Sequence, residues 1–360
     1  MSLKRMSVGV SGLDEILSGG LIAEQAYLVK GQPGSGKTTL GFHFLHAGIA
    51  QGEASLFISF SEPEARMRRN AELIDIDLSQ VEFLDLSPTA DFFTENETYD
   101  IFSPAEVEKA PITEKIIATV EQVKPQRVFL DGIDQFRYFT QDSFQFRQQF
   151  RSFMRFMRDR DITFMFTSEG SDRHPDDDLQ FMSDGVIQLH TTAQRRSIQV
   201  NKYRGSGFIN GYHDLQLSDR GMEIFPQLMM LNLPKPEVEY SQETISSGIP
   251  EIDELMHGGI ERGTVTIISG PSGVGKSTLG TQFMKEAAGR GERSVLYVFE
   301  EAQETLLHRC EAVNIPARIM SERGTLLIVA VEPLQYSSDQ FAYMVKKEVE
   351  QNNARIVMID

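Results

Sequence analysis

Short apolar segments alternate with amphipathic segments along the first half of the chain. The apolar segments are rich in Val, Ile, Leu and Phe, as expected of strands that are buried on both faces of a sheet. The segments between them repeat their apolar positions every three or four residues, which predicts helices covering that sheet. We therefore predict an α/β fold with strands over Ala26–Lys30, Ser55–Phe60, Val128–Asp131 and Thr163–Thr167, and helices over Lys37–Ala50, Ile112–Val123 and Phe144–Arg160.

The pattern changes beyond this point, where apolar and polar residues alternate about short turns such as SDRG. Alternation of period two between turn residues is typical of antiparallel strands. We expect these strands to extend the mostly parallel central sheet with antiparallel hairpins over Val186–His190, Ser197–Tyr203, Leu215–Leu217 and Met222–Phe225.

The chain also repeats itself. The stretch SVGVSGLDEILSGGLIAEQAYLVKGQPGSGKTTLGFHF, which begins at Ser7, aligns without a gap with SSGIPEIDELMHGGIERGTVTIISGPSGVGKSTLGTQF, which begins at Ser246. A repeat of this length indicates a duplicated domain rather than a solenoid. Between the copies, LNLPKPEVEY has the prolines and polar residues of a linker. We expect a first domain over residues 1–235, a linker over 236–240 and a second domain over 241–360.

Composition and charge narrow the classes of function. The 360 residues are 40% hydrophobic and 24% charged, which is typical of a soluble globular protein. The sequence has neither an apolar run long enough for a membrane span nor a secretory leader. We therefore predict a cytoplasmic protein without a membrane partner. One cysteine excludes an internal disulfide framework. The formal charge of −17 argues against nucleic acid as a partner.

Both copies contain a phosphate-binding loop. GQPGSGKT and GPSGVGKS fit G-x-x-x-x-G-K-[ST], and each lies between a predicted strand and a predicted helix. The glycines let backbone N–H groups surround the phosphates, the lysine neutralises them, and the hydroxyl binds Mg²⁺. Two such matches in register exclude chance. The expected ATP-binding residues are Gly31, Gly34, Ser35, Gly36, Lys37, Thr38 and Thr39 in the first copy, and Gly270, Gly273, Val274, Gly275, Lys276, Ser277 and Thr278 in the second.

Magnesium needs a second group, which is usually a carboxylate at the end of a neighbouring buried strand. RVFLD ends at Asp131, 94 residues after Lys37, and RIVMID ends at Asp360, 84 residues after Lys276. We expect Mg²⁺ to bind Thr38 with Asp131 in the first copy and Ser277 with Asp360 in the second. Because the second aspartate is also the last residue of the sequence, we expect an incomplete second domain that needs about 100 further residues, by analogy with the first.

The strand after the P-loop helix ends in FSE in the first copy and in FEE in the second. Carboxylates at this position can polarise the water that attacks the γ-phosphate. With SGLDEILSGGL, SDGVIQL, NKYRGSG and GMEIFP, these motifs resemble the KaiC family of RecA-like ATPases over essentially the whole chain. The resemblance implies that Glu300 and Glu301 serve ATP hydrolysis. In the first copy the resemblance implies this role for Glu62 only. Ser61 replaces the other glutamate, and a serine cannot act as a carboxylate base.

The resemblance also implies that one subunit sends a lysine and an arginine into the nucleotide site of its neighbour. Lys202 and Arg204 of NKYRGSG match these residues, and strand alternation places both on one face. The family therefore implies a homo-oligomeric ring, expected to be a hexamer, with ATP and Mg²⁺ as cofactors and with regulatory protein partners. The implied role is signalling or timing, through ATP-dependent conformational change or self-phosphorylation.

Two alternatives remain open at the level of sequence. The same fold supports DNA-dependent ATPases such as recombinases and helicases, against which the acidic charge and the tandem arrangement weigh. The first domain could also be a scaffold that binds ATP without turnover.

Overall fold

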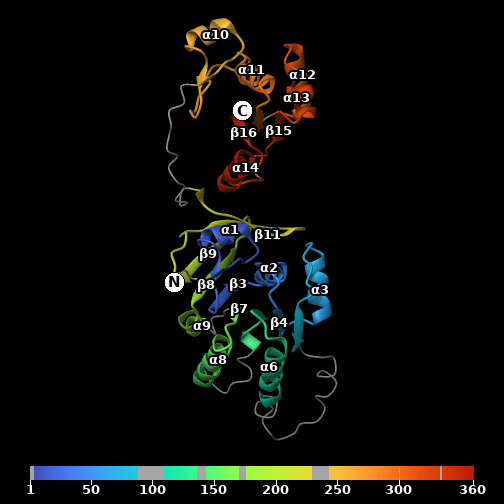
Figure 1. Ribbon diagram of the computed structural model, residues 1–360, viewed down its shortest axis with the longest axis vertical. Coiled ribbons are helices and arrows are strands. Elements are labelled where there is room, and N and C mark those ends of the chain that lie inside the picture. Colours follow the sequence, from blue (N-terminus) through green and yellow to red (C-terminus); the bar gives the residue numbers. More distant parts are fainter. Residues whose placement is uncertain are drawn as a thin grey trace. The chain divides into compact units, whose positions relative to one another are not determined.

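The computed structural model describes residues 4–87, 109–135, 143–169, 176–228, 243–299, 301–332 and 335–360. The chain forms two compact units, Met1–Leu231 and Asn232–Asp360, which we call unit 1 and unit 2 and describe separately (Figure 1). The predicted domain boundaries at 235 and 241 stay predictions, because they fall outside the described residues. Within the described ranges, no helix is both long enough and apolar enough to cross a membrane.

Unit 1 is built on a nine-stranded sheet with the order β11-β10-β9-β8-β3-β7-β6-β4-β5. Its strands are β3 (Ala26–Gly31), β4 (Ser55–Ser59), β5 (Glu82–Asp85), β6 (Arg127–Asp131), β7 (Thr163–Ser168), β8 (Gly185–Thr191), β9 (Arg196–Tyr203), β10 (His213–Ser218) and β11 (Gly221–Phe225). The pairs from β8 through β3 to β5 are parallel, whereas β8 to β11 pair antiparallel. This mixed sheet confirms the predicted fold class, and β5 is the strand that the sequence pattern missed.

Helices cover both faces of the unit 1 sheet, because alternate residues of its central strands point to opposite sides. Phe129 of β6 packs in one cluster with residues of α2, whereas Leu130 packs in a second cluster with residues of α6 and α8. The helices of unit 1 are α1 (Ser11–Ile16), α2 (Lys37–Ala50), α3 (Glu64–Glu72), α6 (Lys109–Val123), α8 (Ser143–Arg158) and α9 (Asp177–Met182). A short ladder of β1 (Arg5–Met6) and β2 (Leu21–Ile22) precedes the sheet.

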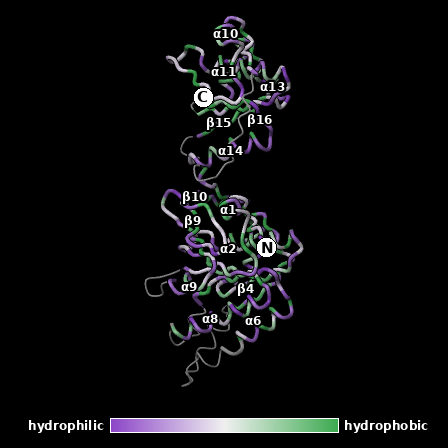
Figure 2. Tube along the Cα trace, turned by 60° about the vertical axis from the view of Figure 1, so that its left-hand side comes forward, coloured by the Kyte–Doolittle hydropathy of each residue, from purple (hydrophilic) through white to green (hydrophobic). Residues whose placement is uncertain are grey.

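Helix α8 confirms the predicted separation of its aromatic and basic residues. Phe146 and Phe150 are buried against the sheet, while Arg147 and Arg155 are exposed on the outside. The same alternation of hydrophobic and hydrophilic residues is visible along α6 and α8 in Figure 2. The basic stripe of this helix is therefore the solvated side of a core helix.

Unit 2 contains a three-stranded parallel sheet with the order β15-β14-β16. The strands of this sheet are β14 (Arg293–Val298), β15 (Leu326–Ala330) and β16 (Ala354–Ile359), and a separate antiparallel ladder pairs β12 (Thr244–Ile245) with β13 (Ile260–Glu261). The helices of unit 2 are α10 (Pro250–Leu255), α11 (Lys276–Gly289), α12 (Gln303–Ala312), α13 (Ala317–Glu322) and α14 (Ser338–Glu350). In the sequence alignment of the two copies, α11 begins and ends at the positions that correspond to the first and last residues of α2.

The sequence places a strand before the second P-loop, and this prediction is wrong for the structure. Residues 264–269 have no regular secondary structure, and Val265 and Ile267 are 93% and 86% exposed. The aligned strand of unit 1, β3, pairs with β7 on one side and β8 on the other. The described part of unit 2 contains no strand that corresponds to β7 or β8, so this apolar segment has no ladder to join.

Candidate nucleotide-binding sites

The P-loop of unit 1 joins the end of β3 to the start of α2, at the centre of the sheet. Gly34 and Gly36 have φ of 77° and 102°, a region that strains residues with a Cβ atom. Gly36 is the N-cap of α2, and no side chain caps that helix. The N–H groups of the first helical turn therefore have no partner within the helix and are suited to bind an anion.

Lys37 folds back over this loop. Its Nζ atom donates to Gly31 O at 2.8 Å and to Gln32 O at 3.2 Å, and the residue is only 8% exposed. The hydroxyl of Ser35 is also buried, without a hydrogen-bond partner among the described residues. A buried hydroxyl normally has a hydrogen-bond partner, so the position of Ser35 is suited to a hydrogen bond with a polar ligand or a water molecule in the loop.

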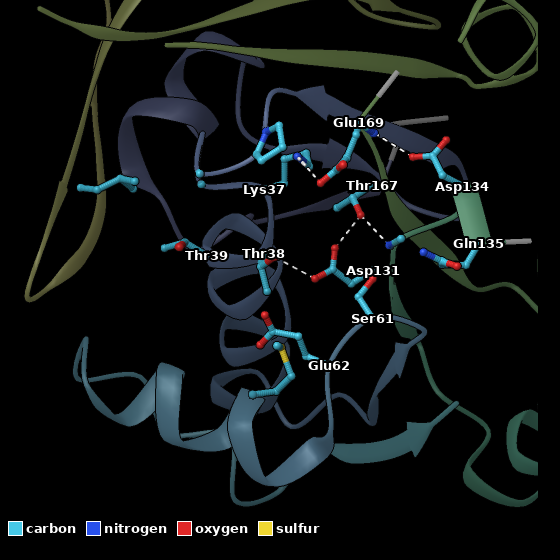
Figure 3. A pocket seen from close by; sticks show the side chains of 16 residues that line it. Lys37, Thr38, Thr39, Ser61, Glu62, Asp131, Asp134, Gln135, Thr167 and Glu169 are labelled. Carbon is cyan, nitrogen blue, oxygen red and sulfur yellow. Dashed lines mark hydrogen bonds and ion pairs between the residues drawn. The ribbon is translucent and has the colours of Figure 1, made fainter. Parts of the chain in front are cut away.

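The hydroxyl and the carboxylate predicted to bind magnesium lie together. Thr38 Oγ1 donates to Asp131 Oδ2 at 2.7 Å, and Thr167 Oγ1 at the end of β7 donates to Asp131 Oδ1 at 2.6 Å (Figure 3). Hydroxyl and carboxylate oxygens are the ligands that Mg²⁺ prefers. The described residues contain no cluster of three or more His, Cys, Asp or Glu that could enclose a metal. The donor set therefore fits a magnesium ion that completes its coordination with phosphate and water.

A cavity of about 550 Å³ opens between the P-loop and the ends of β4, β6 and β7. It is lined by Pro33, Gly34, Gly36, Lys37, Thr38, Thr39, Ser61, Glu62, Met67, Asp131, Gly132, Asp134, Gln135, Thr167, Glu169 and Leu217. The structure thus places Ser61 and Glu62 in the cavity beside the P-loop.

Two carboxylates of this cavity have basic partners. Glu62 Oε2 lies 3.1 Å from Arg66 Nε, and Glu169 Oε1 lies 3.8 Å from Lys37 Nζ. Sequence reasoning missed Glu169 and Thr167. Thr167 lies at the end of β7, and Glu169 directly follows that strand. Ligands bind at the carboxyl ends of parallel strands, so both residues could have been predicted if the strand order had been known.

Unit 2 repeats the same contacts with different residues. Lys276 Nζ donates to Gly270 O at 3.0 Å and to Pro271 O at 3.1 Å, and Ser277 Oγ donates to Asp360 Oδ1 at 3.0 Å. A cavity of about 400 Å³ is lined by Ser272, Gly273, Gly275, Lys276, Ser277, Thr278, Val298, Glu301, Arg309 and Asp360.

The remaining residues predicted for unit 2 differ in their placement. Glu301 Oε2 is 2.7 Å from Arg309 Nη2 at the edge of the cavity, whereas Val274 does not line it and is 61% exposed. Glu300 lies outside the described residues.

Lys202 lies near the end of β9, whereas Arg204 follows the last residue of that strand, so the predicted alternation along one strand does not extend to both. Neither residue lines the cavity of unit 1. Lys202 Nζ donates to Gln180 O at 2.8 Å and to Phe181 O at 3.0 Å, at the end of α9. Arg204 Nη1 is 3.5 Å from Asp184 Oδ1, and its side chain is 53% exposed. Desolvation and the neighbouring Arg204 charge lower the pKa of Lys202, while Asp184 opposes them. Both side chains are therefore held by their own chain, Lys202 by the end of α9 and Arg204 by Asp184.

A mostly parallel sheet with a P-loop at its centre, a strand-end aspartate bound to the loop hydroxyl, and added antiparallel strands defines a RecA-like P-loop ATPase. The model of the KaiC ATPase family matches residues 6–229 and 245–360, and the chain belongs to this family. The two matched segments agree with the duplication seen in the sequence.

Several curated relatives align with almost the whole chain. The circadian clock oscillator protein KaiC of Prochlorococcus marinus (strain MIT 9313) is 27% identical, with 100% of this chain and 73% of the relative covered. The circadian clock protein KaiC3 of Synechocystis sp. is 26% identical, with 99% and 72% covered. The circadian clock oscillator protein KaiC of Synechococcus elongatus is 25% identical, with 100% and 70% covered. The chain is a KaiC-type ATPase.

Proposed function

We propose that copies of this chain assemble into a cytoplasmic ring of six subunits that binds and hydrolyses Mg·ATP. The ring has a signalling or timing role, exerted through ATP-dependent conformational change or self-phosphorylation. The observation that carries the proposal is the recurrence, in both units, of a P-loop lysine folded onto its loop and a hydroxyl bonded to a strand-end aspartate. Self-association as a trait of the KaiC family supports the ring.

Each part of the unit 1 site has a distinct task in this proposal. The loop N–H groups and Lys37 bind the phosphates, and Thr38 and Asp131 hold Mg²⁺, which would neutralise charge on the phosphate oxygens. Thr167 fixes the orientation of Asp131 by donating to its second oxygen. Glu62 is the carboxylate placed to polarise the attacking water.

The basic residues at the end of β9 support catalysis between neighbouring subunits. Arg204 is more than half exposed and does not line the cavity of its own unit, so its guanidinium can act on nucleotide held by another copy. An arginine that stabilises the transition state of phosphoryl transfer contributes about 10³–10⁵ in rate. In such a ring, assembly is a condition of activity.

One observation favours a second function for unit 1, as a scaffold that holds ATP without turnover. Ser61 stands where unit 2 carries a glutamate, and the one carboxylate that remains, Glu62, is 3.1 Å from Arg66 Nε. This ion pair holds the carboxylate against Arg66 rather than leaving it to a water molecule.

Turnover and assembly mass, measured on one preparation, test the proposal. In the Lys276→Ala chain, which silences unit 2, we expect ATP hydrolysis that single-stranded DNA does not stimulate, together with a hexamer in native mass spectrometry. Retention of ATP without turnover would support the scaffold instead. Stimulation by DNA, or a monomer that binds no ATP, would contradict the ring ATPase.

A further inference from the structure

The hairpin formed by β10 and β11 packs directly on the P-loop of unit 1. Leu217 of this hairpin lines the nucleotide cavity. A Cβ atom added to Gly36 would lie 3.0 Å from Met222 Cε and 3.3 Å from the δ-carbons of Leu217. The loop glycine and the hairpin are therefore in close contact, and the hairpin forms one wall of the site.

A histidine of α2 holds this hairpin in place. The backbone N–H of Met222 donates to His43 Nε2 at 2.8 Å. A Cβ atom on the preceding Gly221, whose φ is 89°, would lie only 2.3 Å from the same nitrogen, so glycine is required for this approach. Because Nε2 accepts a hydrogen bond here, the ring must be neutral and carry its proton on Nδ1.

The surroundings of the ring favour its neutral form. Burial lowers the pKa of His43 to about 4, and His46, one turn further along α2, acts in the same direction. Several charged residues of the elements around the ring are exposed: Glu223 of β11, Asp219 and Arg220 in the β10–β11 turn, and Asp75 and Asp77 on either side of the buried Ile76. Asp214 of β10 is partly exposed, and Lys37 of α2 donates to carbonyl groups of the P-loop.

We infer that His43 is a positioning residue for the nucleotide site of unit 1, and that its protonation releases the β10–β11 hairpin from the P-loop and weakens ATP binding. The inference rests on the proposed binding of ATP by unit 1. Unit 2 has Gln282 at the aligned position. An amide oxygen can accept a hydrogen bond but does not titrate, so glutamine at residue 43 keeps an acceptor and removes the acid sensitivity.

The direction of the pH effect follows from the two states of the hairpin. A freed histidine has its ordinary pKa near 6.5, above its pKa in the closed state. Closure is therefore favoured fully above about pH 6.5 and loses stability as the pH falls toward 4. By proton linkage, the ratio of closed to open hairpin should fall about 30-fold between pH 7.5 and pH 5.

Hydrogen exchange of the Met222 amide in the full chain without nucleotide measures this ratio directly. After correction for the intrinsic exchange rate, its protection should fall about 30-fold from pH 7.5 to pH 5 in the wild type. In His43→Gln, which copies unit 2, the fall should be less than about threefold. His46→Gln is the matched control on the same helix and should keep most of the wild-type response, because burial is the larger cause of the lowered pKa of His43. An equal response in wild type and His43→Gln would overturn the assignment of His43.

Binding of a non-hydrolysable ATP analogue tests the link to the site, in a Lys276→Ala background that silences unit 2. The dissociation constant should rise more steeply with acid in the wild type than in His43→Gln, while protonation of the nucleotide itself affects both variants equally. If Met222 protection falls with acid but the dissociation constants of the two variants change equally, the proposed link between the hairpin and ATP binding is refuted. Absence of binding at pH 7.5 in both variants would instead contradict the proposed function. If His43→Gln does not fold, wild-type protection that is flat from pH 7.5 to 5 still refutes the inference.

Discussion

At the scale of single residues, Ser61 is the position where the chemistry of the two units differs. It is exposed, lines the nucleotide cavity of unit 1 and lies beside Gly132, directly after the strand-end aspartate. The cavity therefore has room for a longer side chain at this position. A hydroxyl cannot take up a proton at neutral pH, whereas a carboxylate can.

We predict that Ser61→Glu raises ATP turnover by unit 1 about 10–100-fold, because it supplies the carboxylate that general base catalysis requires. The measurement is steady-state hydrolysis with Lys276→Ala present in every chain. Ser61→Gln has a similar volume without a base, and it is the matched control that should stay at the parental rate. Equal rates for both variants, with ATP binding intact, would show that Glu62 already suffices or that unit 1 is a scaffold.

The sequence predicted those site residues whose position depends on a local motif. The lysine and hydroxyl of each P-loop come from one eight-residue pattern, and Asp131 was found because a buried strand ends in it. Thr167 and Glu169 were missed, because their proximity to Asp131 and Lys37 depends on β7 lying between β3 and β6. Strand order is a tertiary property that hydrophobic periodicity does not encode.

At the scale of elements, the contact between α2 and β6 places the loop hydroxyl beside its aspartate. A Cβ atom on Gly41 of α2 would lie 2.2 Å from the ring of Phe129 on β6. This glycine lets the helix approach the sheet closely enough for Thr38 to reach Asp131. The aligned Gly280 of α11 approaches Met358 of β16 in the same way, with 2.4 Å to its sulfur.

We predict that Gly41→Ala destabilises unit 1 by about 1–3 kcal/mol in denaturant unfolding, because it overpacks a rigid aromatic ring. Helix propensity alone would favour alanine by about 1 kcal/mol, so a net loss identifies the contact with Phe129. Phe129→Leu in the same chain should restore part of the loss. Gly280→Ala should cost less, because a methionine side chain can move aside.

Gly207→Ala is the control, since its Cβ atom would meet nothing within 4 Å. It should change the free energy of unfolding by less than about 0.5 kcal/mol. Stabilisation by Gly41→Ala would contradict the packing described for α2 and β6.

Hydrophobic periodicity predicted the elements of unit 1 well, since each segment is buried by its own unit. Helix α2 matches its predicted bounds at both ends, and β6 begins one residue before its predicted start. The same reasoning failed for residues 264–269 of unit 2, where an equally apolar segment has no neighbouring strand among the described residues. The pattern reports that a segment can be a strand, whereas its partners decide whether it becomes one.

At the scale of the whole molecule, the net charge of −17 and the basic residues Lys202 and Arg204, of which Arg204 has a side chain 53% exposed, bear on how copies assemble. Lys202 and Arg204 contact the end of α9 in their own chain, while the cavity of that chain is lined by carboxylates such as Glu62 and Glu169. Opposite charges on the two surfaces suit a head-to-tail contact between identical subunits, which closes into a ring when the rotation allows it.

In the proposed ring, Arg204 of one subunit acts on ATP held by Lys37 of the next. Lys37→Ala and Arg204→Ala chains should each hydrolyse ATP weakly in unit 1, with Lys276→Ala present throughout. In rings mixed from both, some interfaces pair an intact P-loop with an intact arginine. Activity should therefore exceed the weighted average of the two parents, with subunit exchange verified by native mass spectrometry.

The matched control replaces Arg204→Ala in the mixture by Arg155→Ala, an exposed arginine on the outside of α8. This partner should keep parental activity alone and give only additive activity when mixed with Lys37→Ala. If unit 1 holds ATP without turnover, the same comparison is made on ATP retention. Complementation in the Lys37→Ala and Arg204→Ala mixture is the result that the shared site predicts, and strictly additive behaviour in fully exchanged rings would contradict it.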